Sequence, residues 1–161
     1  MKSNLILLAI GIIFLFSCSN KTDDQKNKVA NAPIMGTWKL ISGMTIQNGD
    51  TTFTDYTKNQ KGIKIINDTH FSFMSHDLVR GKDSSAVFVS GGGRYTLSGN
   101  KYTEYLEFCN YREWEDNKFD FTVAINNDTL IQSGIEKVKD IGVDRITIEK
   151  YVKLKELKKL N

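Results

Sequence analysis

From position 33 onward the chain repeats one simple unit, a run of β-branched and aromatic residues followed by a short cluster of Asn, Asp or Gly. This repeat is typical of an antiparallel meander, because β-branched and aromatic side chains favour strands and the clusters favour tight turns. The candidate strands are Gly36–Ser42, Thr52–Tyr56, Gly62–Ile66, His70–Ser75, Ser85–Ser90, Gly93–Leu97, Tyr102–Cys109, Lys118–Ile125, Thr129–Ser133 and Val143–Val152. We expect some of these to be two halves of one bent strand.

Apolar residues alternate within several runs, which predicts strands with one buried and one wet face. The alternating sets are Ile63 and Ile65, Phe71 and Phe73, Phe119 to Ile125, and Ile146 and Ile148. An open sheet of this length would expose its edges, and closure removes them. The predicted fold class is therefore all-β, an antiparallel up-and-down barrel of about eight to ten strands. Such an interior is either filled by side chains or holds one small ligand, and the sequence leaves both outcomes open.

The N-terminal 17 residues read as a secretory signal peptide. The apolar run from Leu5 to Phe16 is shorter than the roughly 20 residues that a spanning helix needs. A small residue before Cys18, with Leu15 three positions ahead of the cysteine, resembles the lipobox of bacterial lipoproteins. The resemblance implies that Cys18 is lipidated, becomes the mature N-terminus and makes membrane lipid the first partner of the chain.

Residues 18–32 are mostly polar and are expected to form a flexible tether with a reach of roughly 20 Å. Ser19 after the cysteine resembles lipoproteins sent to an outer membrane, and Lys21-Thr22-Asp23-Asp24 resembles the export signal of Bacteroidetes surface lipoproteins. The expected location is the bacterial cell envelope at the outer membrane, with the periplasmic and the surface face both open. Residues 33–153 then form the barrel domain, and 154–161 form a basic tail, either solvated or a short amphipathic helix on anionic lipid.

The number of cysteines and the net charge further restrict the functions that the chain can have. Only two cysteines exist, so lipidation of Cys18 leaves Cys109 without an intramolecular partner. In an aromatic-rich strand such a thiol is expected to be a small buried hydrophobic group. The net charge is +3 with both signs mixed along the chain, which gives no support for nucleic-acid binding.

The run Met35-Gly36-Thr37-Trp38-Lys39-Leu40 resembles the Gly-x-Trp opening of the lipocalin superfamily. The segments 64–73, 91–97, 102–104 and 148–153 are similar, in the same order, to small lipocalin-like (calycin-type) lipoproteins common in Bacteroidetes. The resemblance implies that Gly36 and Trp38 are structural and close one end of the barrel. In that family a late Arg stacks on the opening Trp; here the candidates for that position are Arg145, Lys150 and Lys153.

No chemical motif indicates catalysis. The run Ser90-Gly91-Gly92-Gly93 lacks the Lys and helix of a phosphate loop, so a bend or bulge is expected. His70 and His76 have no metal-ligand spacing, and neither a metal nor a cofactor is expected. The crowded carboxylates from Glu104 to Asp116 lack a nucleophile with a neighbouring base. We expect no catalytic residues and no enzyme, with an unrecognised barrel enzyme as the weaker alternative.

The segment from Phe108 to Glu115 places aromatic rings and an Arg at a strand end, which favours either a recognition surface or a cap over one barrel mouth. If a ligand enters the barrel, the expected lining is aromatic with an Arg supplying polarity: Phe71, Phe73, Tyr95, Tyr102, Phe108 and Phe121, with Arg94 or Arg112. The leading hypothesis is a non-catalytic, lipid-anchored envelope protein that holds a small apolar ligand. The alternative is a surface interaction or structural module with a filled barrel, whose protein partner is unknown.

Overall fold

The structure is a computed structural model that describes residues 33–155. It contains nine strands: β1 (Gly36–Gln47), β2 (Asp50–Asp55), β3 (Gln60–Ile66), β4 (His70–Asp77), β5 (Phe88–Ser98), β6 (Lys101–Cys109), β7 (Asn117–Asn126), β8 (Thr129–Val138) and β9 (Val143–Lys153). Two short 3-10 helices, η1 (Arg112–Trp114) and η2 (Lys139–Ile141), connect β6 to β7 and β8 to β9. The predicted signal peptide, the Cys18 lipidation site, the tether to residue 32 and tail residues 156–161 lie outside the described residues.

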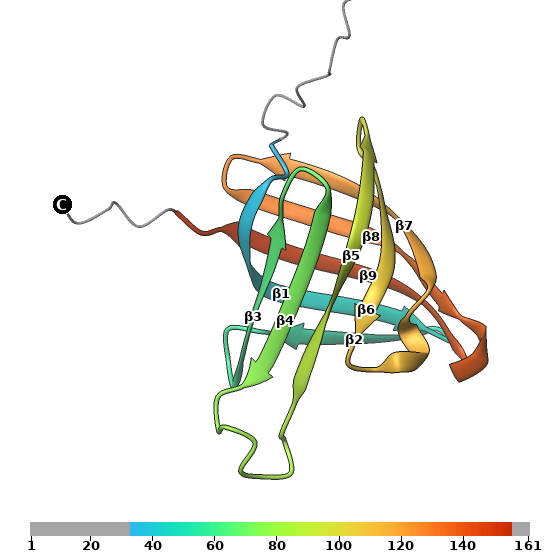
Figure 1. The fold of residues 1–161 in the computed structure, drawn as a ribbon. Coiled ribbons are helices and arrows are strands. Elements are labelled where there is room, and N and C mark those ends of the chain that lie inside the picture. The colour runs from blue at the N-terminus through green and yellow to red at the C-terminus, as the bar shows by residue number, and fades with distance from the viewer. Residues whose placement is uncertain (1–32, 156–161) are drawn as a thin grey trace, which may run out of the picture.

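The strands form a closed antiparallel barrel of eight strands with one extra strand, in up-and-down order (Figure 1). The barrel closes where β1 pairs with β9 on one side and β3 on the other. β3 uses only the first part of β1, Gly36 to Lys39, and the extra strand β2 pairs with the second part, Ser42 to Gln47. The predicted all-β up-and-down barrel is confirmed, and the fold is consistent with a lipocalin-like barrel.

The two ends of the barrel differ. The closed end contains the tight turns 67–69, 99–100 and 127–128, together with the entry of the chain at Pro33 and the end of β9. The loop end contains the connections 48–49, 56–59, 78–87, 110–116 and 139–142. Figure 1 shows the N-terminal entry and the long β4–β5 connection at opposite ends of the molecule.

The glycine run in β5 is a bulge site, as the sequence predicts. The pairing of β5 with β6 shifts register between Gly92 and Gly93, where Leu106 and Phe108 are the successive partners and Glu107 is the extra residue. A Cβ atom at Gly93 would lie 1.9 Å from the Tyr105 carbonyl oxygen, so only glycine fits. The predicted strands Ser85–Ser90 and Gly93–Leu97 therefore correspond to a single bulged strand, β5, which begins at Phe88.

Two of the four alternating apolar sets face the opposite way from the prediction. Phe71 and the Phe119 to Val123 set are buried, as expected. In contrast, Ile65 and Ile146 are about two-fifths exposed. Lys64, which lies between Ile63 and Ile65 on the same strand, is buried. The Ile63/Ile65 and Ile146/Ile148 sets therefore lie on the outside of the barrel, and polar residues between them point inward.

Candidate binding sites inside the barrel and at its loop end

A buried lysine occupies the interior of the barrel. Lys64 on β3 is 2% exposed, and its ammonium group donates a 2.9 Å hydrogen bond to Gln132 Oε1 on β8. It also forms an ion pair with Glu104 on β6. The rings of Phe71, Tyr102 and Tyr151 surround the same ammonium, with centroids 5.2, 5.5 and 5.8 Å from Nζ. Side chains from five strands thus meet at one cation in the middle of the barrel.

Glu104, the carboxyl partner of this lysine, is itself buried. Burial raises the pKa of Glu104, and the Lys64 ammonium opposes that rise. The Tyr102 hydroxyl is also fully buried; burial and the nearby Glu104 carboxylate raise the pKa of Tyr102. Among the described residues the Tyr102 hydroxyl forms no hydrogen bond of acceptable geometry. This polar group is therefore incompletely paired within the fold.

Further inward-facing charges lie between this network and the loop end. The Tyr151 hydroxyl donates a 2.6 Å hydrogen bond to Glu149 on the same strand. Arg145 donates a 2.6 Å hydrogen bond to Glu136, and its guanidinium carbon lies 5.3 Å from the centroid of the Trp114 ring. Burial raises the pKa of Glu136, and Arg145 opposes the rise. The inner surface therefore carries charged groups from its middle toward the loop end, among the apolar side chains of the core.

Five of the eight predicted ligand-lining residues lie in or against the core. Phe71, Tyr102 and Phe121 belong to the buried core, and Phe73 and Tyr95 pack against it. These side chains pack among the residues that fill the barrel. The fully buried large side chains are Ile34, Trp38, Lys64, Tyr102, Leu130 and Gln132.

The other three predicted lining residues point outward, so a ligand inside the barrel would not touch them. Phe108 is 66% exposed because the bulge at Glu107 reverses the alternation of β6 and turns Cys109 inward instead. Arg94 and Arg112 are exposed and donate hydrogen bonds to Glu107 and Glu115 at 2.5 and 2.7 Å.

In the aromatic segment after β6, for which both a cap and a recognition surface were open, one ring packs against the barrel and another is exposed. Trp114 on η1 folds back against the barrel, 6.0 Å from the Phe119 ring centroid and over Arg145. It therefore acts as a cap at the loop end. Tyr111 is 47% exposed and faces solvent.

Gly36 and Trp38 lie at the closed end of the barrel. Trp38 is fully buried and its indole N–H donates a 2.7 Å hydrogen bond to the Ile34 carbonyl oxygen. Of the three basic candidates, Lys153 takes the position over the ring, with Nζ 5.1 Å from the centroid. A Cβ atom at Gly36, where φ is +136°, would contact the same lysine side chain at 2.8 Å. Lys153 also donates to the Pro33 carbonyl oxygen, so both ends of the barrel domain meet here.

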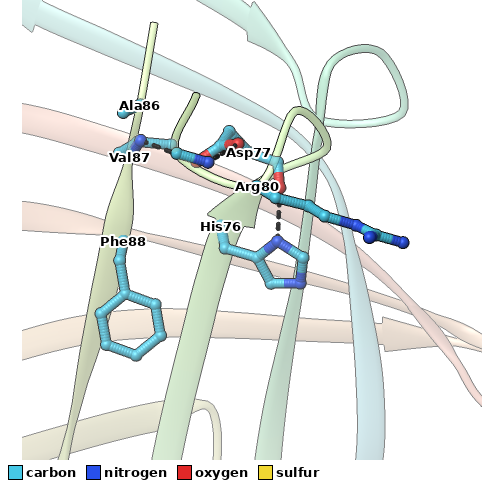
Figure 2. Close-up of a pocket in the computed structure, with 7 residues that line it drawn as sticks. His76, Asp77, Arg80, Ala86, Val87 and Phe88 are labelled. Carbon is cyan, nitrogen blue, oxygen red and sulfur yellow. Dashed lines mark hydrogen bonds between the residues drawn. The ribbon is translucent and has the colours of Figure 1, made fainter. Parts of the chain in front are cut away.

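A pocket of about 340 Å³ lies at the loop end, beneath the β4–β5 connection, and sequence reasoning did not single it out. Its lining comes from His76, Asp77, Arg80, Gly81, Ala86, Val87 and Phe88 (Figure 2). The Asp77 carboxylate accepts one hydrogen bond from Gly81 N at 2.9 Å and another from Val87 N at 3.0 Å. These two bonds hold the pKa of Asp77 below its usual value and join the two ends of the connection.

The outer surface carries an apolar patch across four strands. The register places Phe53 beside Met44 and Met44 beside Ile148; it also places Ile46 beside Ile146 and Ile146 beside Ile135. We call these six residues the outer patch. Phe53 and Ile135 are about three-fifths exposed, which is unusual for side chains of this kind.

Cys109 is buried with a free thiol, and burial raises its pKa. Within residues 33–155, no group of three His, Cys, Asp or Glu side chains is arranged to hold a metal ion. Neither of the helices in that range is long and apolar enough to cross a membrane.

No protein-family model matches the chain, and no curated protein matches it significantly.

Proposed function

We propose that this chain is a lipid-anchored, non-catalytic binding protein of the bacterial cell envelope, lipocalin-like in architecture, that recognises its ligand at the loop end. The observation that carries the proposal is the Lys64, Glu104 and Gln132 network, which occupies the interior with the protein's own side chains. The lipobox resemblance at Cys18 and the Gly-x-Trp opening support the anchor and the family likeness. Outer-membrane placement belongs to the same proposal.

A small apolar ligand inside the barrel is disfavoured by the chemistry of that network. Such a ligand would have to lie against a buried ion pair or displace one of its members. Uncompensated burial of a charge is expensive, so an apolar ligand would gain little there. The loop end is different, because its connections expose charged and aromatic side chains such as Arg80, Arg112 and Tyr111. The long β4–β5 connection lies on the side away from the N-terminal entry (Figure 1).

Native mass spectrometry of the full chain, extracted from membranes in detergent, tests where a ligand is held. We expect no apolar molecule to be retained by the barrel. Retention of a lipid-like molecule that Lys64→Met alters, and that substitutions in the β4–β5 connection leave unchanged, would contradict recognition at the loop end.

The outer patch favours a second candidate, in which the barrel is a scaffold that binds another protein through β1, β2, β8 and β9. A photo-crosslinking residue at Ile135 should then capture one defined protein in intact cells. The same residue at Thr122, an exposed position on the outer face of the neighbouring β7, is the matched control. Equal capture at both positions would remove this candidate.

A further inference from the structure

The β4–β5 connection is held in one shape by its own side chains. Asp77, 5% exposed, accepts amide hydrogen bonds from Gly81 within the connection and from Val87 at its far end, and the Asp77 amide donates to the Val87 carbonyl oxygen at 3.1 Å. Asp83 in turn accepts a 2.8 Å hydrogen bond from the Ser85 amide. The pocket beneath the connection, about 340 Å³ in volume and open to solvent, is therefore framed by a hydrogen-bonded loop.

Arg80 sits in this connection at an unfavourable backbone position. Among the described non-glycine residues with positive φ, four are Asn or Asp, which adopt the left-handed region readily. The fifth is Arg80, with φ +62°, where an Asn or Gly would fit better. A backbone cost at an Arg that lines a pocket is typical of a residue whose side chain is needed there.

The guanidinium of Arg80 has no carboxylate partner among residues 33–155, since none of the ion pairs in that range includes it. Both oxygens of the pocket's own carboxylate, Asp77, already accept backbone hydrogen bonds. The pocket therefore presents a guanidinium without an ion-pair partner, which suits a carboxylate or phosphate, beside an Asp77 carboxylate whose oxygens are turned toward backbone amides.

Two further groups of the lining, the half-buried His76 and the exposed Phe88, suit the rest of such a ligand. His76 and Phe88 are cross-strand partners, and in the view of Figure 2 the His76 ring lies between the Phe88 ring and the Arg80 side chain. His76 Nδ1 lies 2.5 Å from the Asp77 carbonyl oxygen, which can only accept, so Nδ1 carries a proton, and in the neutral ring Nε2 is left to accept from a hydroxyl. Phe88 is 59% exposed and offers an apolar ring face.

We propose that the β4–β5 pocket binds a small anionic sugar, with Arg80 on its carboxylate or phosphate, His76 Nε2 on a ring hydroxyl and Phe88 against the apolar face of the ring. This inference rests on the proposed function, because it names the ligand class of the loop end. A carboxylate and a phosphate share the chemistry that Arg80 recognises.

Calorimetric titration of the full chain in detergent tests the proposal, with amide NMR shifts to locate binding. The probes are glucuronate, glucose 6-phosphate, glucose and glucosamine. We expect saturable binding of glucuronate, of glucose 6-phosphate or of both, with shifts at Gly81, Val87 and Phe88. Which of the two binds identifies the anionic group. Glucose should bind about tenfold more weakly, and glucosamine weaker still.

Arg80→Asn removes the charge and suits the left-handed backbone, so the connection keeps its fold while affinity for the anionic probe falls about tenfold. Lys82→Gln, in the same connection but outside the pocket lining, is the matched control and should bind as the wild type does. Absence of binding by both anionic sugars, or equal binding by glucosamine or by Arg80→Asn, would overturn the proposal. In that case a ligand mapped elsewhere at the loop end would leave the proposed function standing, whereas retention inside the barrel would remove both.

Discussion

Lys64 shows how one side chain can decide what the interior of a barrel accepts. Its ammonium is neutralised by Glu104, bonded by Gln132 and surrounded by three aromatic rings. A buried ion pair contributes little net stability relative to well-packed apolar residues, yet removing one partner is strongly destabilising. The network therefore specifies which side chains meet in the core more than it strengthens the fold.

Lys64→Met should destabilise the protein by about 3–5 kcal/mol near neutral pH, because Glu104 is left buried and charged without a partner. The effect depends on pH. Burial already raises the pKa of Glu104, and losing Lys64 raises it further. A carboxyl whose pKa is higher in the folded state stabilises the fold at acidic pH and loses that contribution as pH rises through the folded-state pKa. Denaturant unfolding should show a smaller difference from wild type at about pH 5 than at about pH 8.

The double substitution Lys64→Met with Glu104→Gln is the control for this prediction. It removes both charges, so stability should recover in part and the added pH dependence should disappear. A single variant that loses the same stability at both pH values would show that lost packing, rather than the isolated carboxylate, is responsible.

At the scale of the element, β5 and β6 are positioned by a glycine that no other residue can replace. Gly93→Ala should destabilise the barrel by at least about 1–3 kcal/mol, because its Cβ would meet the Tyr105 carbonyl oxygen and the bulge would have to shift. Thermal unfolding measures the loss. Thr96→Ala, exposed on the same strand, should change stability by only a few tenths of a kcal/mol. A Gly93→Ala protein as stable as Thr96→Ala would contradict the rigidity of the bulge.

The fold could be predicted from the sequence because the turn clusters mark the strand ends well. Asn48 and Gly49, with φ of 54° and 86°, form a two-residue turn between β1 and β2, and the cluster at 126–128 joins β7 to β8. The residues of β3 alone do not show which of its faces points into the barrel, since Ile63, Ile65 and Ile66 place apolar side chains on both faces of the strand. Register with β4 resolves it: Ile66 pairs with Phe71 and Lys64 with Phe73, so all four share the inner face.

The candidate sites were harder to predict than the strands. Simple alternation from Tyr102 along β6 places Phe108 inside the barrel, but the extra residue Glu107 reverses that alternation. The loop-end pocket depends on Asp77 bonding to amides four and ten residues away, a contact with no periodic signal in the sequence.

At the scale of the whole molecule, the proposed lipid anchor at Cys18 and the proposed recognition at the loop end would together define an orientation on the membrane. Cys18→Ser should move the protein from the membrane fraction to the soluble fraction, or leave it as unprocessed precursor, since acyl chains contribute about 0.8 kcal/mol per buried methylene. Fractionation and immunoblotting follow the change, with Cys109→Ser as the matched control that stays in the membrane. A Cys18→Ser protein that remains tightly associated with membranes would disprove lipid anchoring at this residue.

The pairing of β1 with β9 has a consequence for biogenesis. The barrel closes only when Val143–Lys153 aligns with Gly36–Gln47, and Lys153 covers Trp38 only at that last step. A chain that is threaded through a translocation channel from its N-terminus therefore cannot complete this domain while its final strand is still inside. Its sheet must wait, with the β1 edge unpaired, until more than a hundred residues have emerged. If the chain is exported as proposed, it would depend during that interval on the chaperones that bind unfolded proteins in the receiving compartment.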